Sequence, residues 1–211
     1  MIGARSEETQ DSPGPVIFTI GHGAGPVAGV ISLLEGAGVR RLVDIRTAPG
    51  SRRHPQFGQE ALAETLRHHG IEYIWRKDLG GWRKPRPDSP NTALTSPGFR
   101  GYADYMETPE FRAALEWLID GGRDGATAIM CAESVWWRCH RRMVSDALTV
   151  RGCVVMHLLP DGRRQPHVLH PTARLDGDQI VYDRPASREA SEFRSPGTAR
   201  GRLRTPRPEA P

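Results

Sequence analysis

Short apolar runs alternate with stretches of helical spacing along this chain. The apolar, often β-branched runs predict buried strands at residues 15–21, 41–46, 71–75, 126–131 and 153–159. Between them, apolar residues recur every three or four positions. This spacing predicts helices from residue 27 to a stop at 36–38, from 57 to a stop at 70, from 109 through 118, and over 137–150.

The alternation of strands and helices favours βαβ units. We therefore predict an α/β fold with a mainly parallel five-stranded sheet and helices on both faces. Asp176-Gly177 lies between two short runs in residues 174–182 and predicts a small C-terminal hairpin. The long polar stretch 77–98 is typical of a functional or disordered loop.

The two ends of the chain differ in composition from its middle. Residues 1–14 are polar and predict a flexible leader, and residues 184–211 predict a disordered tail rich in arginine and proline. Residues 15–183 then form a single α/β domain. The net charge of +4 is carried by the tail, because the remaining residues balance at 22 basic and 22 acidic side chains. The basic isoelectric point therefore does not indicate a nucleic-acid groove in the domain itself.

Neither end nor middle suggests a membrane or secreted protein. No apolar run approaches the length of a membrane span, and the N-terminus lacks the apolar middle of a secretory signal. The three cysteines have no disulfide-framework spacing, so we expect reduced thiols, metal ligands or catalytic groups. A cytoplasmic protein with no membrane partner is the expectation.

Polar side chains gather where the predicted strands end. Parallel α/β sheets bind ligands beyond the carboxyl ends of their strands, so these residues are candidates for one site. They are His22, Asp44, Arg46, Ser51, Arg53, Cys131, Glu133 and His157.

Residues 128–142 hold the densest group of reactive side chains. Cys131 lies between a strand and a helix, where helix amides and dipole lower a thiol pKa, although a buried strand cysteine is the alternative. Glu133 suits a general base, a metal ligand, a partner for Arg46 or Arg141, or a helix-start carboxylate. Cys153 begins an apolar strand and is predicted to belong to the core.

Cys139 and His140 are adjacent in the predicted helix. Adjacent helical residues point about 100° apart, so we expect that these two side chains cannot easily face one ligand. Cys131, Glu133, Cys139 and His140 are the residues that a metal ion would use, but they lack the paired spacing of known zinc motifs. The sequence requires no cofactor and leaves a metal open.

Two familiar phosphate-binding templates do not fit. A phosphatase loop needs arginine six positions after the nucleophile, where Trp137 stands, and Arg138 comes one residue later. The glycines at 21, 23 and 25 do not match the dinucleotide fingerprint. An anion could still bind at the helix start among Arg46, Arg53 and Arg138. Trp136 and Trp137 suit base stacking or packing against the sheet.

Several segments together resemble a known family. They are TIGHG at 19–23, LVDIR at 42–46, HPQF at 54–57, GIEY at 70–73, LGG at 79–81, FRGYADYM at 99–106 and CAESVWWRCHRR at 131–142. The chain is similar over residues 18–182 to the domain of unknown function 488 family of bacteria and archaea. The resemblance implies an α/β sandwich and an active site at Cys131, Glu133, Cys139, His140 and Arg141, with no established reaction. Gly23 departs from the serine of many members.

Three functions are compatible with these observations. The first is an enzyme on a phosphate-bearing ligand, a nucleotide or nucleic acid, with Cys131 as nucleophile or redox thiol and the carboxylates and imidazole as acid and base. The second is a metal-dependent hydrolase, and the third a non-catalytic nucleic-acid-binding module that uses the arginine tail. In the first, the catalytic residues are Cys131, Glu133, His140 and Asp44, and the binding residues are His22, Arg46, Ser51, Arg53, Arg141, Trp137 and His157.

Overall fold

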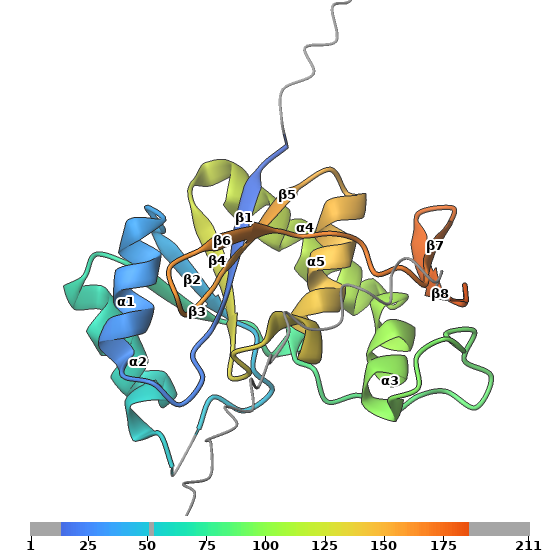
Figure 1. The fold of residues 1–211 in the computed structure, drawn as a ribbon, viewed down its shortest axis with the longest axis horizontal. Helices are drawn as coiled ribbons and strands as arrows, with labels where there is room; N and C mark the ends of the chain where they lie inside the picture. Colours follow the sequence, from blue (N-terminus) through green and yellow to red (C-terminus); the bar gives the residue numbers. More distant parts are fainter. Residues whose placement is uncertain (1–13, 51–52, 186–211) are drawn as a thin grey trace, which may run out of the picture.

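The structure is a computed structural model that describes residues 14–50 and 53–185 (Figure 1). The predicted leader and tail lie outside these ranges, except for Gly14 and residues 184–185. Their flexibility and the extent of the single domain therefore stay predictions. Within the described chain, a mixed β-sheet stands between two layers of helices (Figure 1).

The sheet of the described chain has six strands in the order β3-β2-β4-β1-β5-β6. They are β1 (Val16–Gly21), β2 (Arg41–Asp44), β3 (Glu72–Trp75), β4 (Thr127–Cys131), β5 (Val154–Leu158) and β6 (Arg164–Pro166). β1 to β5 pair in parallel and β6 pairs antiparallel with β5. The predicted α/β class and mainly parallel sheet are confirmed. The additional strand β6 is short and polar, so it lacks the apolar pattern that identifies the others.

Helices cover both faces of the sheet, as predicted. One face carries α1 (Val27–Gly36) and α2 (Gln59–His68), and the other carries α3 (Pro97–Met106), α4 (Pro109–Asp124) and α5 (Arg141–Val150) (Figure 1). The alternation of side chains along β1 shows the division, because Ile17 belongs to the core under α4 and α5 whereas Phe18 belongs to the core under α1 and α2.

The predicted loop over residues 77–98 is held in place by hydrogen bonds. It begins with the short helix η2 (Lys77–Leu79) and ends at α3, a helix that the apolar pattern did not predict. The buried carboxylate of Asp104 in α3 accepts bonds from Arg86 N, Ser89 Oγ and Asn91 Nδ2 at 2.5–2.8 Å. Since three groups of the loop converge on one carboxylate, the loop is a fixed part of the fold.

The predicted C-terminal hairpin is confirmed as β7 (Ala173–Asp176) and β8 (Gln179–Tyr182), with Gly177 at φ 62° in its turn. Tyr182 attaches this hairpin to the rest of the domain. Its backbone N–H donates to Asn91 Oδ1 at 3.0 Å, and its hydroxyl donates to Asp146 Oδ2 in α5 at 2.9 Å. The hairpin therefore secures both the long loop and α5.

Candidate metal centre

The carboxyl ends of β2 and β4 form the switch point of the sheet. The chain leaves β2 through α2 toward one edge and leaves β4 through α5 toward the other, although β2 and β4 are neighbours. Open α/β sheets bind ligands in the crevice that such a divergence creates. Cys131 is the last residue of β4, and Ile45 directly follows β2, so both lie at this switch point.

The segment between β4 and α5 is not the continuous helix that the sequence predicted. A short helix, η3 (Trp136–Arg138), ends before Cys139, whose backbone is extended with φ −127° and ψ 154°. The regular helix α5 begins only at Arg141. The prediction that Cys139 and His140 diverge rested on a helical backbone and is wrong. Their Sγ and Nδ1 atoms lie 3.5 Å apart.

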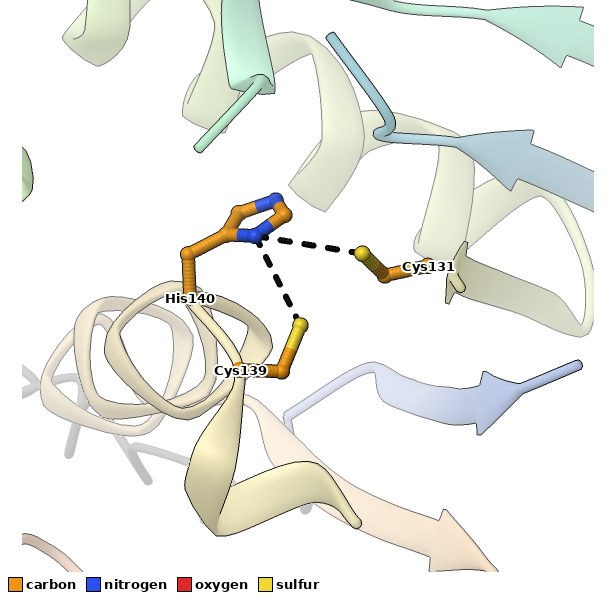
Figure 2. A group of neighbouring side chains, drawn as sticks. All are labelled: Cys131, Cys139 and His140. Atoms are coloured by element: carbon orange, nitrogen blue, oxygen red, sulfur yellow. Dashed lines mark hydrogen bonds between the residues drawn. The ribbon is translucent and has the colours of Figure 1, made fainter. Parts of the chain in front are cut away.

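Cys131, Cys139 and His140 point toward one another, as Figure 2 shows. Cys131 Sγ approaches His140 Nδ1 to 3.9 Å from the side of the sheet, and the two sulfurs and the nitrogen all lie within 4.8 Å of one another. Cys139 is buried, whereas Cys131 and His140 are half-buried. Two thiols and an imidazole thus share one partly accessible space.

The orientation of His140 is set by its second ring nitrogen. Nε2 lies 3.1 Å from the carbonyl oxygen of Ile45, so it carries the proton and donates, which leaves the lone pair of Nδ1 facing the two thiols. Gly81 lies against the ring, since a Cβ there would be 2.5 Å from Nδ1. Tyr102 packs at a ring-centroid distance of 5.2 Å. The imidazole is therefore held in one tautomer and one position.

These three side chains fit a zinc-type ion. Zn²⁺ binds thiolate sulfur at about 2.3 Å and imidazole nitrogen at about 2.0–2.1 Å, so tetrahedral ligands lie about 3.5–3.8 Å from each other. The observed sulfur–nitrogen distances of 3.5 and 3.9 Å are close to this value. A ligating histidine also commonly donates its other N–H to a backbone carbonyl, as His140 does to Ile45.

The two thiols differ in acidity. The hydrogen bond between them, together with the nearby Arg141 guanidinium, lowers the pKa of Cys139. The same hydrogen bond, together with burial, raises the pKa of Cys131. These shifts favour Cys139 over Cys131 as the more acidic thiol of the pair.

Arg141 and Glu133 take different places from those predicted. The Arg141 side chain is buried, and its Nη2 donates to the carbonyl oxygens of Glu133 and Ser134. The Glu133 carboxylate is exposed and accepts a bond from Val135 N at 3.1 Å. It is not among the side chains that converge within 4.8 Å in the described chain. Arg141 thus braces the turn after β4, and Glu133 stands at its outer surface.

A second buried group lies beside the crevice and contains Asp44, Arg46 and His22. The Asp44 carboxylate forms an ion pair with Arg46 and accepts the hydroxyl of Tyr73 at 2.7 Å. Arg46 Nη1 lies 3.2 Å from His22 Nε2, while His22 Nδ1 donates to the carbonyl of Gly23. These three of the predicted strand-end residues lie together, but Arg46 already has an anionic partner in Asp44.

Burial governs the ionisation of this second group. It lowers the pKa of His22 to about 4 and, with the hydrogen bond to Asp44, raises the pKa of Tyr73. Burial also lowers the pKa of Arg46, but its hydrogen bonds and Coulomb attraction to Asp44 outweigh this effect, and the net pKa is raised. At neutral pH the group therefore contains one paired arginine and one neutral imidazole.

His157 belongs to a separate buried chain of hydrogen bonds under α5. Thr19 Oγ1 lies 2.7 Å from His157 Nδ1, His157 Nε2 lies 3.0 Å from His167 Nδ1, and His167 Nε2 lies 2.8 Å from Asp146 Oδ1. The Trp136 ring stacks on His157 with centroids 4.0 Å apart. This chain connects the sheet to α5 and anchors η3, so His157 supports the centre from a distance and is not one of the three converging side chains.

The neutral state of His157 predicts a loss of stability in acid. Burial, and next to it the charges of His167 and Arg141, lower the pKa of His157 to about 2. At pH values below the ordinary histidine pKa of about 6.5, His157 is protonated in the unfolded chain but stays neutral in the folded chain. The free energy of unfolding therefore decreases as pH falls. For this residue alone the loss between pH 7 and pH 5 is about 2 kcal/mol.

Urea unfolding at several pH values checks this prediction. We expect a His157→Gln variant to show a shallower fall in unfolding free energy between pH 7 and pH 5 than the natural chain, whatever its absolute stability. An unchanged slope would show that His157 is not held neutral by the fold.

The remaining predicted site residues are spread more widely. Ser51 lies outside the described residues, Arg53 is exposed, and Trp137 is 43% exposed beside the buried Trp136. Cys153 is buried in the core, as predicted. Sequence reasoning did not assign a role to Gly81 or to the carbonyl of Ile45, although both lie in segments, LGG and LVDIR, that carried the family resemblance.

Comparison with known protein families confirms the resemblance that these segments indicated. A family model described as domain of unknown function DUF488 matches residues 26–148, more than half of the chain. The chain belongs to this family. The part matched by the DUF488 model contains Cys131, Cys139 and His140 and ends before His157. Searches of curated proteins and of solved structures found no match. Among the described helices, none is long and apolar enough to cross a membrane.

Proposed function

We propose that this DUF488 protein is a metal-dependent hydrolase whose metal ion is bound by Cys131, Cys139 and His140. One observation carries the proposal: two sulfurs and one imidazole nitrogen lie within 4.8 Å of one another, with the nitrogen lone pair directed at the sulfurs by the bond from Nε2 to Ile45. Thiolate and imidazole together are the ligands that zinc prefers.

Three protein ligands favour a catalytic role over a structural one. Structural zinc sites are closed by four protein ligands, whereas catalytic sites have three and keep one open position. Among the described residues, the convergent histidine, cysteine and acidic side chains number three. Cys131 and His140 are half-buried, and the centre lies at the switch point of the sheet, where open α/β sheets bind their ligands.

The chemistry follows from the ion and from the residues around it. A zinc ion with an open position polarises a carbonyl or phosphoryl oxygen and lowers the pKa of water to about 7. The chain contributes a fixed His140, an Arg141 that braces the turn after β4, and the exposed Glu133 as the candidate proton acceptor at the surface.

A thiol nucleophile is the second candidate function, favoured by the same His140 Nδ1. This nitrogen lies 3.5 Å from Cys139 Sγ and 3.9 Å from Cys131 Sγ, within reach of a proton from either thiol. The phosphate-bearing ligand predicted for this function would need cations other than Arg46 and Arg141, which have protein partners. The arginine tail of the third candidate lies outside the described residues apart from Arg184 and Pro185.

Hydrolysis of chromogenic esters separates the two enzymatic candidates. Purified protein is assayed on p-nitrophenyl acetate, p-nitrophenyl phosphate and bis(p-nitrophenyl) phosphate, then after dialysis against a chelator, then after addition of Zn²⁺. We expect turnover of at least one ester that disappears with the metal and returns with Zn²⁺. Turnover that survives metal removal but ends on thiol alkylation would favour the nucleophile, and no turnover by zinc-loaded protein would contradict a hydrolase.

A further inference from the structure

Two segments beside the metal centre share an unusual composition. Trp82 is followed by Arg83 and Lys84, and Trp137 is followed by Arg138. Trp82 is 82% exposed and Trp137 is 43% exposed, so both leave aromatic surface accessible to solvent. We call Trp82 and Trp137 the rim tryptophans.

The backbone holds both rim tryptophans next to the centre. Trp82 directly follows Gly81, which lies against the His140 ring, and a Cβ on the preceding Gly80 would be 2.8 Å from Thr47 Oγ1. The loop therefore runs between Thr47, three residues after β2, and the imidazole. The backbone of residues 83–85 also packs on Gly101 of α3. A Cβ on Gly101 would lie 2.5–2.7 Å from backbone atoms of these residues. The exposed Trp82 ring thus extends from a fixed chain.

Trp137 is placed next to the centre by a different segment, η3. It lies in η3, two residues before Cys139, and its ring meets the edge of Trp136 at a centroid distance of 5.5 Å and an angle of 85°. Trp136 is itself fixed by stacking on His157 and by a bond to Gln165 Oε1 at 3.3 Å. The loop that covers His140 and the segment that leads into Cys139 therefore each present one tryptophan.

The cations on these segments are available to a ligand. Lys84 and Arg138 are exposed, and neither forms an ion pair with a described residue. Some exposed arginines elsewhere in the domain, namely Arg123, Arg151 and Arg163, have carboxylate partners instead. An exposed aromatic ring beside an unpaired cation is the combination that binds an unpaired base and its phosphate.

We propose that the rim tryptophans stack a nucleobase while Lys84 and Arg138 bind the adjoining phosphate, so that the metal centre acts on a nucleotide unit. The ligand is either a free nucleotide or the unpaired end of a single strand. A double helix does not fit, because its bases are already stacked and their faces are covered. This inference depends on the proposed function only for the reaction, and the binding itself needs no metal.

Binding to the full-length protein tests the inference directly. Fluorescence anisotropy of a labelled short single-stranded oligothymidylate is measured with chelator-treated and with zinc-loaded protein. Competition by thymidine monophosphate, by inorganic phosphate and by duplex DNA then separates the sources of the ligand. We expect single strand or nucleotide to bind, with inorganic phosphate and duplex much weaker.

Matched variants identify the residues responsible. Loss of a stacked base costs about 1–3 kcal/mol, so Trp82→Ala and Trp137→Ala should each weaken binding by about 5- to 150-fold, and Trp82→Phe should restore most of it. Leu175→Ala, which shortens an exposed apolar side chain on β7, should have no effect. Lys84→Ala and Arg138→Ala should weaken binding and reduce its salt dependence. Arg40→Ala, an exposed arginine at the amino end of β2, should do neither.

Three results would overturn the inference. They are the absence of binding, equal binding of single strand and duplex, and full binding by Trp82→Ala and Trp137→Ala. A preference for phosphatidylserine vesicles over the oligonucleotide would assign the rim tryptophans to a membrane surface and reject a nucleotide. A protein that binds nucleotide but no metal would refute the proposed function alone, and a protein that binds zinc but no nucleotide would refute this inference alone.

Discussion

An Asp44→Ala variant is expected to lose about 3–5 kcal/mol of its free energy of unfolding. Asp44 has no exposed surface and is the carboxylate partner of Arg46, which is 6% exposed. Without it, a buried guanidinium would have no anion, and the Tyr73 hydroxyl would lose its acceptor. Removal of one member of a buried ion pair is costly because the remaining charge stays in a poorly solvated place.

A matched substitution on the adjacent strand provides the control. Glu72→Ala breaks the ion pair with Arg41, but that pair is exposed, and such pairs contribute about 0–1 kcal/mol. Urea unfolding followed by tryptophan fluorescence gives both values. If Asp44→Ala lowers the free energy of unfolding no more than Glu72→Ala does, the buried group around Asp44 does not stabilise this end of the sheet.

A Cys139→Ser variant is expected to bind zinc at least about 100-fold more weakly than the natural chain. Substitution of a residue that only orients a metal ligand already lowers metal affinity about 10- to 100-fold. Cys139 is itself a proposed ligand, so its loss should have a larger effect. A serine hydroxyl keeps the shape of the side chain but does not replace a thiolate as a zinc ligand.

Cys153→Ser is the matched control for this effect. Cys153 is the third cysteine of the chain, is buried in the core just before β5, and is not part of the convergent group. Competition with a chromogenic zinc chelator measures both affinities. We expect Cys153→Ser to keep its zinc affinity even where it lowers stability, and equal affinities of the two variants would remove Cys139 from the site.

The strands and most helices could be predicted because each depends on a local pattern. Strands that are buried on both faces need continuous apolar residues, and β1, β2, β4 and β5 show them. The polar ends of these strands also identified Cys131, Asp44 and His22 as neighbours of a crevice. Fold class and the position of the candidate site thus follow from sequence pattern and topology.

The arrangement inside the site could not be predicted from local pattern. Cys139 is extended because contacts from distant segments hold η3 in place, in particular Trp136 on His157 and on Gln165. Helical spacing in residues 137–150 carries no information on those contacts. The group that orients His140 is the backbone carbonyl of Ile45, and a pattern of side chains does not reveal which backbone carbonyl accepts a hydrogen bond.

The ion-pair and hydrogen-bond partners of the arginines could not be predicted from the sequence either. Arg46 and Arg141 were expected to bind an anionic ligand, yet each is occupied by protein oxygens, in Asp44 and in the turn after β4. Lys84 and Arg138 lie in exposed segments and lack such partners among the described residues. Whether a cation is available to a ligand depends on its neighbours in space, which residue type alone does not reveal.

X-ray absorption spectroscopy of the zinc-loaded natural protein tests the proposed metal centre, because it reports the atoms bound to the ion. We expect two sulfur ligands at about 2.3 Å and one imidazole nitrogen at about 2.0–2.1 Å, with a lighter ligand at the open position. A coordination shell of nitrogen and oxygen without sulfur, or a protein that retains no zinc, would contradict a metal centre at Cys131, Cys139 and His140.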